Sequence, residues 1–309
     1  MGGNQAVNVN PPNANFHLTT HGSDWLWTVF SIMGLSLIIA IATTVMRPRG
    51  TRLFHQIAVV VLITASIAYF SMASDLGATP VVVEFRGSGT RQIFFVRYIQ
   101  WFITFPLLLL SLLLATGVSL SDIFTTIFMG IVLVIMGLVG ALVPSSYKWG
   151  YYAFGLVALL YIWYSLLLHA PAASFASGGA MRRGYYSAAA YLSFMLFTYP
   201  LAWALAEGSN VISVTSEMIW YGILDILSGP VFLALFLFHL RSVDYAIFGL
   251  SSGKYVDHGG RGAAGVGSGV GAGNASGVGG TGMASEKGPN PATAPMAGSP
   301  NAHTGAQAV

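Results

Sequence analysis

Long apolar stretches separated by short polar connections run through the chain from Trp25 to Leu240. A helix of roughly 20 residues crosses a hydrocarbon core of about 30 Å. Seven stretches have about this length: Trp25–Met46, Leu53–Ala73, Gln92–Ala115, Ser121–Val143, Trp149–His169, Tyr186–Ala206 and Ile212–Leu240. Because most connections are short, consecutive helices are expected to lie antiparallel in one bundle. The pattern predicts an all-α membrane protein with seven transmembrane helices.

Two connections are longer, residues 74–91 and residues 170–184. The first contains the run Thr79-Pro-Val-Val-Val-Glu-Phe-Arg-Gly-Ser-Gly, which is rich in β-branched residues and ends in a glycine turn. Such a run favours two paired strands. We therefore expect a small hairpin on the membrane surface between the second and third helices.

The arginines near the span ends predict the orientation, because Lys and Arg are retained on the cytoplasmic side of a membrane. One face of the predicted bundle has Arg47, Arg49, Arg52, Arg182, Arg183 and Arg241. The opposite face has Arg86, Arg91 and Lys148, mixed with Asp75, Glu84 and Glu207. We therefore expect the N-terminus outside and the C-terminus in the cytoplasm.

The two ends of the chain differ in composition from the seven-helix domain, which spans residues 25–249. Residues 1–24 are polar and rich in Pro and Asn, which predicts an extracellular tail and no cleaved signal peptide. Residues 250–309 are mostly Gly, Ala and Ser. They cannot bury enough apolar area to offset the entropy of ordering, so a disordered cytoplasmic tail is expected.

Composition leads to the membrane independently of the pattern. The 309 residues are 55% hydrophobic and only 7% charged, with a mean hydropathy of +0.69, whereas soluble domains are about 25% charged. The bilayer is therefore an expected partner. The absence of cysteine excludes thiolate chemistry. A net charge of +3 without a dense basic stretch predicts no nucleic-acid binding. No metal site is expected at His169, because no second histidine or acidic residue stands at ligand spacing from it in the sequence.

The third predicted span carries a long motif, Arg97-Tyr98-Ile-Gln100-Trp101-Phe-Ile-Thr104-Phe-Pro106-Leu-Leu-Leu-Leu110-Ser111. It resembles the R-Y-x-D-W-x-x-T-x-P-L-L-L-x-D segment of microbial, bacteriorhodopsin-like rhodopsins. Further matches are spread over the other spans: Tyr69, Gly137, Tyr199, Trp203, Glu217 and Asp225. The resemblance covers Trp25 to Gly249 and implies an opsin-like bundle.

The same resemblance identifies groups that this chain lacks. In the family, a lysine one turn after the seventh-helix aspartate carries retinal as a Schiff base, whereas here Asp225 is followed by Gly229. Without an amine no Schiff base forms. The family's pumps use carboxylates at the positions of Gln100 and Ser111 as proton acceptor and donor, and neither an amide nor a hydroxyl titrates near neutral pH.

The resemblance also implies an altered chromophore pocket. Tyr152 and Leu196 stand where the family has tryptophans around the polyene, and the rest of this vestigial pocket is Trp101, Gly137, Tyr199 and Trp203. We therefore expect no cofactor, neither covalent nor non-covalent retinal.

Several polar positions remain inside the predicted spans: Tyr69, Arg97, Thr104, Glu217 and Asp225. An unpaired charge inside a membrane is costly, so we expect Arg97 and Asp225 to form an ion pair. One interpretation is a remnant ion or water pathway through these residues. The other, which we favour, is a satisfied buried pair that fixes the packing of two helices.

An opsin scaffold without the lysine resembles a fungal branch of the family, the opsin-related and thirty-kilodalton membrane heat-shock proteins. This implies a stress-responsive plasma-membrane protein, not an enzyme, that modulates transport proteins such as the proton ATPase, or membrane integrity. The alternative is a light-independent ion or proton channel or transporter that uses the vacant retinal cavity. Gly130, Gly137 and Gly140 suit helix packing within one chain or between chains, so the sequence leaves a homo-oligomer open.

Overall fold

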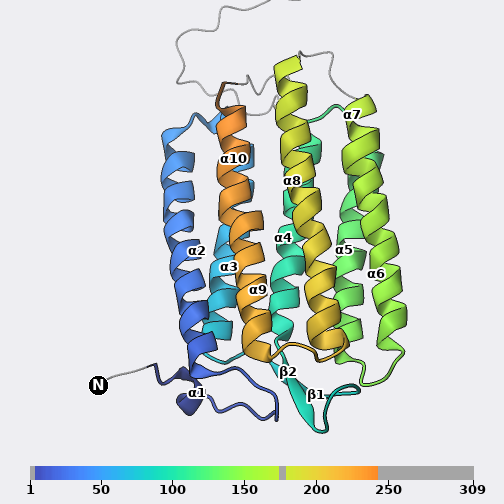
Figure 1. The fold of residues 1–309 in the computed structure, drawn as a ribbon. Coiled ribbons are helices and arrows are strands. Elements are labelled where there is room, and N and C mark those ends of the chain that lie inside the picture. Colours follow the sequence, from blue (N-terminus) through green and yellow to red (C-terminus); the bar gives the residue numbers. More distant parts are fainter. Residues whose placement is uncertain (1–3, 174–178, 243–309) are drawn as a thin grey trace, which may run out of the picture. The chain divides into compact units, whose positions relative to one another are not determined.

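The computed structural model of the chain describes residues 4–173 and 179–242 (Figure 1). Within these residues, seven helical spans are long and apolar enough to cross a membrane. Five are built on α2 (Thr20–Met46), α3 (Leu53–Ala73), α4 (Phe95–Leu114), α5 (Leu120–Leu142) and α6 (Lys148–Trp163), the sixth on α8 (Gly179–Trp203), and the seventh on α9 (Val214–Ile226) with α10 (Phe232–His239). The predicted seven-helix membrane bundle is confirmed. The predicted disordered tail lies outside the described residues.

Side chains at three helix starts supply the hydrogen bonds that the first backbone N–H groups of a helix lack. The Thr19 side chain accepts from Gly22 N at the start of α2, and Ser119 accepts from Asp122 N at the start of α5. Ser213 accepts from Ser216 N at the start of α9. These caps place the first turns of α2, α5 and α9 directly after Thr19, Ser119 and Ser213.

Three spans contain a π-helical turn: η2 (Tyr164–His169), which continues into α7 (Ala170–Ala173), η3 (Ala204–Gly208) and η4 (Leu227–Val231). The last contains Gly229 and Pro230. Proline cannot donate to the helix ladder, and a wider turn accommodates that gap. The Leu227 carbonyl in this turn also accepts a hydrogen bond from the Tyr191 hydroxyl at 3.1 Å.

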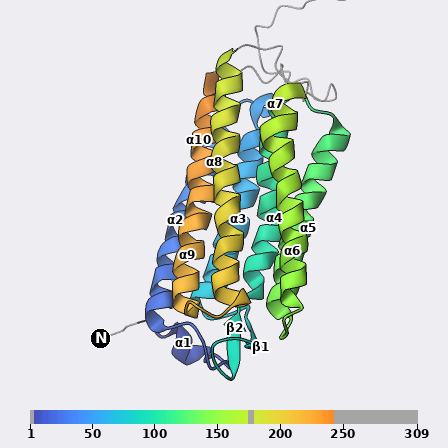
Figure 2. The same ribbon diagram turned by 45° about the vertical axis from the view of Figure 1, so that its right-hand side comes forward.

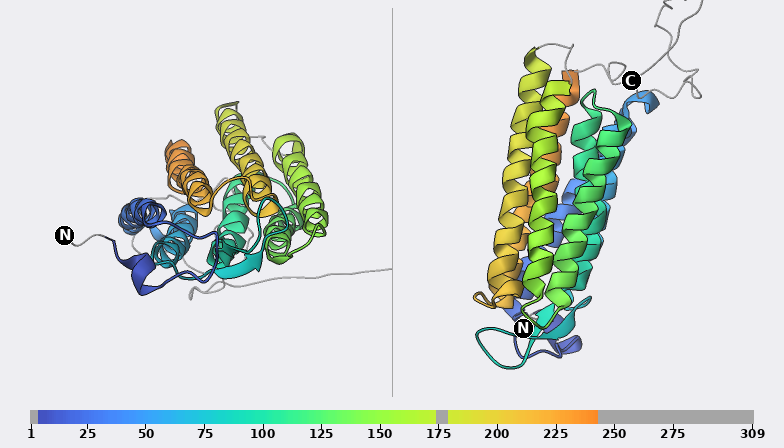
Figure 3. Two further views of the ribbon diagram at one scale, coloured as in Figure 1. Left: turned by 60° about the horizontal axis from the view of Figure 1, so that its bottom comes forward. Right: turned by 90° about the vertical axis from the view of Figure 1, so that its right-hand side faces the viewer.

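The seven spans run along a common direction and close into a ring (Figures 2 and 3). Each span packs on the next in the sequence, and α2 also packs on α9. The short 3₁₀ turns η1 (Arg49–Thr51) and η5 (Leu240–Ser242) lie at the ends of spans. Large apolar side chains such as Ile38, Phe124 and Phe194 point outward, with 66%, 72% and 62% of their surface exposed. The outer surface of the bundle is therefore suited to lipid.

The predicted hairpin is present: β1 (Thr79–Val82) pairs antiparallel with β2 (Thr90–Ile93). It lies at the same end of the bundle as α1 (Ala6–Val9), which we call the hairpin end (Figure 1). Gln92, expected to begin the third helix, instead pairs with Pro80 in the strand, and α4 begins at Phe95. Which end of the bundle faces outside stays a prediction.

Candidate functional site

Asp225, in the middle of the last span, is a buried carboxylate surrounded by neutral donors. Its side chain is 3% exposed. Oδ2 accepts hydrogen bonds from the Tyr69 hydroxyl at 2.7 Å and from the Gln100 side-chain amide at 3.0 Å. Oδ1 accepts from the Trp101 indole N–H at 3.0 Å and from the Tyr199 hydroxyl at 2.6 Å. Side chains from α3, α4 and α8 thus converge on one residue of α9.

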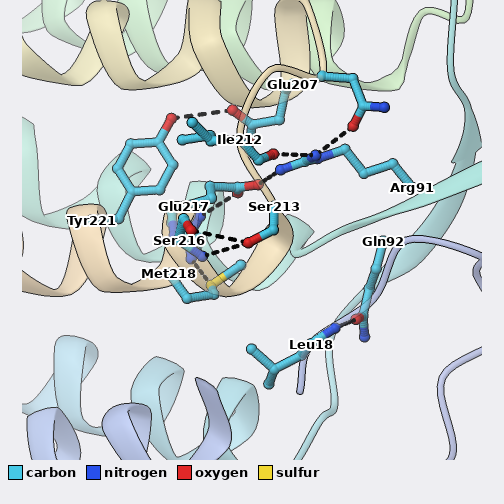
Figure 4. A network of polar contacts seen from close by, with 12 residues as sticks. Leu18, Arg91, Gln92, Glu207, Ile212, Ser213, Ser216, Glu217, Met218 and Tyr221 are labelled. Carbon is cyan, nitrogen blue, oxygen red and sulfur yellow. Dashed lines mark hydrogen bonds and ion pairs between the residues drawn. The ribbon is translucent and has the colours of Figure 1, made fainter. Parts of the chain in front are cut away.

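Arg97 does not pair with Asp225, so the predicted ion pair is wrong. The Arg97 guanidinium lies 3.0 Å from Glu217 Oε1, and Arg91 lies 2.6 Å from Glu217 Oε2. Figure 4 shows Arg91 reaching both Glu217 and the carbonyl of Ile212. Arg97 comes from α4 and Arg91 from β2, so the carboxylate ties the hairpin and two helices together. Glu217 itself is completely buried.

Glu207, at the end of the sixth span, is buried beside this ion-pair cluster. Its two carboxylate oxygens accept hydrogen bonds from the Tyr98 hydroxyl at 2.7 Å and the Tyr221 hydroxyl at 3.1 Å. Figure 4 shows the contact with Tyr221. Its backbone carbonyl accepts from Lys148 Nζ at 3.2 Å. In the sequence, Arg91, Lys148 and Glu207 look like loop charges, but they are only 2%, 3% and 5% exposed.

Aromatic rings join the two carboxylate sites. The Arg97 guanidinium lies over the Tyr221 ring at 4.4 Å and over the Trp101 ring at 5.7 Å. The Trp101 indole in turn donates to Asp225. The predicted remnant network is therefore divided into an ionic part at Glu217 and a neutral-donor part at Asp225, linked by cation–π contacts.

Two separate cavities lie near the Asp225 network, one lined by Asp225 itself and the other by its donors Trp101 and Tyr199. One, of about 10 Å³, is lined by residues that include Gln100, Thr104, Asp225, Ser228 and Gly229. The other, of about 50 Å³, is aromatic and includes Trp101, Gly137, Tyr152, Tyr199 and Trp203. Phe105 lines both of them. Its ring stacks on Trp101 at 5.7 Å and meets Tyr199 edge-on at 5.0 Å.

The family described as bacteriorhodopsin-like protein matches residues 20–243, which is most of the chain. The chain belongs to this bacteriorhodopsin-like family. Protein FDD123 of Trametes versicolor is 74% identical over 255 residues, covering 82% of this chain and 90% of that protein. The 30 kDa heat shock protein of Saccharomyces cerevisiae is 34% identical over 259 residues, covering 72% of this chain and 74% of that protein.

A solved structure extends the family relationship to the fold. The light-driven proton pump of Coccomyxa subellipsoidea superimposes with a TM-score of 0.70 at 33% identity, and the alignment covers 72% of this chain and 98% of the pump. The bundle described here is therefore a rhodopsin bundle.

In this bacteriorhodopsin-like chain, the neutral amide of Gln100 is compatible with the buried carboxylate of Asp225. If the position of Gln100 carried a carboxylate, two buried anions would face each other without the cation of a Schiff base, which is costly. The Gln100 amide instead donates an N–H to Asp225. The Gln100 Oε1 atom has no hydrogen-bond partner among the described residues, and Gln100 lines the smaller cavity.

The residues present do not fit a Schiff-base-linked retinal. The lysines of the chain are Lys148, Lys254 and Lys287, so the last span has none. A Cβ atom built on Gly229 would meet nothing within 4 Å, and the cavity beside it has room for about one water molecule. Beyond it, the rings of Trp101, Phe105 and Tyr199 contact one another: the centroid distances are 5.7 Å for Trp101–Phe105, 5.0 Å for Phe105–Tyr199 and 5.1 Å for Trp101–Tyr199. A polyene has no room between these rings.

The remaining predicted site residues are placed as follows. Leu196 is buried, but it lines neither of the two cavities. The Ser111 hydroxyl donates to the Leu108 carbonyl of its own helix at 2.7 Å, away from Asp225. Phe105, by contrast, was missed because it occupies a variable position of the motif. Its size next to Trp101 and Pro106 is the signal that could have identified it.

Proposed function

We propose that this chain is a non-photoactive member of the bacteriorhodopsin-like family that carries no retinal and takes part in stress responses at the plasma membrane. One observation carries the first half of the proposal. The Asp225 carboxylate, which stands beside the retinal amine in the family, has four neutral donors and no lysine in its span.

The side chains near Asp225 also support the absence of light-driven proton transport. A proton relay needs groups that titrate near the working pH. The family's acceptor and donor positions hold Gln100 and Ser111, and Ser111 is bonded within its own helix. Phe105 further separates the two cavities. A proton that reached Asp225 would find no titratable group at either position.

The stress role rests on likeness to relatives. The chain covers 74% of a relative called 30 kDa heat shock protein, at 34% identity. We infer that the protein acts through contacts within the membrane, with transport proteins such as the proton ATPase or with the bilayer. A bundle whose outer surface is apolar is suited to such a role.

The test of the first half is an absorption spectrum of the purified protein with all-trans retinal, followed by borohydride reduction and mass analysis. The wild-type chain is expected to give no shifted band and no adduct. The Gly229→Lys variant is expected to give no visible pigment, because the contacting rings of Trp101, Phe105 and Tyr199 still leave no room for the polyene. Gly229→Lys combined with Phe105→Thr is expected to give one. A visible pigment in the wild-type chain would refute the proposal.

The test of the second half is reconstitution of the plasma-membrane proton ATPase in liposomes with and without this protein. We expect a lower rate of ATP-driven acidification when the protein is present. A seven-helix rhodopsin that retains its lysine, kept in the dark, is the control for crowding of the bilayer. Equal rates with both proteins would remove the ATPase from the proposal.

A second candidate function is a light-independent channel or transporter for ions or protons. The observation that favours it is the buried row of ionisable side chains at the hairpin end, Arg91, Arg97, Glu207 and Glu217. Liposomes that contain the purified chain alone test it under pH and potential gradients. Flux that is lost in Glu217→Gln would support this candidate, and no flux in any gradient would exclude it.

A further inference from the structure

An open groove lies at the hairpin end, where α1 packs at the foot of α2 (Figure 1). Residues of the segment 4–10 form one side of it, Asp24 and Trp27 of α2 another, and Ser74, which follows α3, the third. Its volume is about 600 Å³, within the range of about 300–1,000 Å³ that is typical of small-molecule sites. The groove is therefore large enough for part of a lipid molecule.

Hydrogen bonds hold the walls of the groove in place. The Asn4 side-chain amide donates to the Ser23 hydroxyl at 2.8 Å and to Asp24 Oδ1 at 2.9 Å. The Asn10 side-chain amide donates to the Ser74 carbonyl at 2.8 Å. The N-terminal segment is thus tied to α2 and to the end of α3, and a ligand would not have to order it on binding.

The groove lies at the depth expected for lipid headgroups. Trp27 is in the first turns of one membrane span, and Ser74 directly follows another. The Trp27 ring meets the rings of Phe30 and Phe70 edge-on, with centroid distances of 5.6 Å to each. Tryptophan is enriched at the level where a bilayer meets water. The lining of the groove is therefore at the membrane boundary.

Below the groove, α3 presents apolar side chains to the bilayer. Ile67 and Phe70 precede Ser74 by seven and four residues, so the three positions share one face of the helix. Ile67 is 62% exposed and Phe70 is 48% exposed. The polar groove thus continues into an apolar surface on which acyl chains can lie.

The groove offers one anionic group and several neutral donors. Asp24, which is exposed, is the only charged residue in its lining. The Gln5 side chain makes no hydrogen bond to the described residues, and the Asn10 amide uses only one of its two N–H donors. Val9 of the lining is 70% exposed, although it is apolar. The groove therefore combines a carboxylate, free amide donors and apolar surface.

We propose that this groove binds one phospholipid with a zwitterionic, amine-bearing headgroup of the phosphatidylcholine or phosphatidylethanolamine class. The amine pairs with Asp24, and the phosphate accepts hydrogen bonds from the amides of Gln5 and Asn10. Trp27 adds an aromatic surface for the cationic amine. A lipid with a net negative headgroup would bring its charge to Asp24 without a cation in the lining. The site goes beyond the proposed stress role and does not rest on it.

The test is a lipid titration of the delipidated full-length protein in detergent, followed by its thermal midpoint. Phosphatidylcholine, phosphatidylethanolamine and phosphatidylglycerol with identical acyl chains are compared. The first two are expected to raise the midpoint in a saturable way, as binding to the native state requires. Their half-saturating concentrations should be lower than that of phosphatidylglycerol by about threefold, the size of an exposed charge interaction.

The Asp24→Asn variant is expected to lose this preference, because its side chain no longer distinguishes an amine from a neutral headgroup. Glu84→Gln removes an exposed carboxylate from the hairpin itself, outside the groove, and is the matched control. It should keep the wild-type preference. Loss of the preference in both variants would show an effect of overall charge and would overturn the proposal.

Native mass spectrometry of the wild-type protein, released from bilayers that contain the three lipids in equal amounts, needs no variant. One retained zwitterionic phospholipid per chain is the expected result. Retention of phosphatidylglycerol in preference to the other two lipids, equal midpoint responses of the wild type to all three, or an unchanged preference in Asp24→Asn would each overturn the proposal.

Discussion

Glu217 and Asp225, two buried carboxylates on the same helix, are stabilised in opposite ways. Glu217 is held by the two guanidinium groups of Arg91 and Arg97. Asp225 lies eight residues further along, about 12 Å at the rise of an α-helix, and is held by hydroxyl, amide and indole donors. The first site is ionic and the second is a cage of neutral dipoles.

The difference follows from what the surrounding chain supplies. At the hairpin end, β2 brings Arg91 within reach of the bundle interior. At the depth of Asp225 the four hydrogen-bond donors come from transmembrane helices, and the last span contains no lysine. Several oriented neutral donors can stabilise a carboxylate there because hydrogen bonds are stronger in a medium of low dielectric constant.

The largest expected effect is that of Glu217→Gln, which leaves two buried guanidinium groups without an anion. Breaking a buried ion pair from one side costs about 3–5 kcal/mol. The free energy of unfolding in detergent should fall by this amount. Glu84→Gln, which changes an exposed glutamate in the same way, is the matched control and should alter stability by less than about 0.5 kcal/mol. Equal losses in the two variants would refute the ionic assignment.

A smaller loss is expected for Asp225→Asn. The amide keeps the shape but turns one oxygen, which accepts two of the four hydrogen bonds, into a donor that faces two other donors. The expected cost is about 1–3 kcal/mol, measured by the same unfolding assay. Asp24→Asn, at an exposed position, is the control. A loss larger than that of Glu217→Gln would reverse the comparison.

Double-mutant cycles distinguish the two sites further. Arg97→Gln combined with Glu217→Gln should show a coupling energy above about 1 kcal/mol, because the two side chains are in contact. Arg97→Gln combined with Asp225→Asn should be nearly additive, with a coupling below about 0.5 kcal/mol. If the coupling energy of Arg97 with Asp225 were larger than that with Glu217, the result would support the ion pair that the sequence predicts between Arg97 and Asp225.

The smallest effect is expected at Asp75, outside the membrane-spanning segments, where a carboxylate is buried without a cation. Burial raises its pKa, and the hydrogen bond that it accepts from Gln92 at 2.7 Å opposes this only in part. The folded state therefore holds the proton more tightly than the unfolded state. Stability should be greatest below the ordinary carboxyl pKa of about 3.9 and should fall as the pH rises through the folded-state pKa.

The Asp75→Asn variant should lack this pH dependence. Thermal midpoints of wild type and variant, measured from about pH 3 to about pH 8, provide the test. If the difference between the two curves is constant over the range, the burial of Asp75 has no electrostatic cost.

Most of the fold could be predicted from local pattern, because the length and hydropathy of a span are properties of consecutive residues. The hairpin could be predicted for the same reason, from β-branched residues followed by glycine. The start of the third helix could not be predicted. Gln92 is next to apolar residues, which favours a helix, and it is part of a strand only because it pairs with the distant Pro80.

The site was predicted less completely because it depends on contacts between distant segments. Asp225 and Tyr69 meet as expected for one network. The partner of Arg97 depends on the depth and rotation of α4 relative to α9, which residue spacing within one helix does not report. Arg91 and Lys148 were interpreted as loop charges because nothing in their neighbouring residues shows that the hairpin and the helix ends bury them.

If the chain carries no retinal, as proposed, the ring contacts of Phe105 bear on how readily light chemistry could be regained during evolution. A chain that gained only a lysine at position 229 would still have the contacting rings of Trp101, Phe105 and Tyr199. A chain that lost only the bulk of Phe105 would have no amine in its last span to hold retinal. On this proposal two changes are needed together, and selection for light use could act on neither alone.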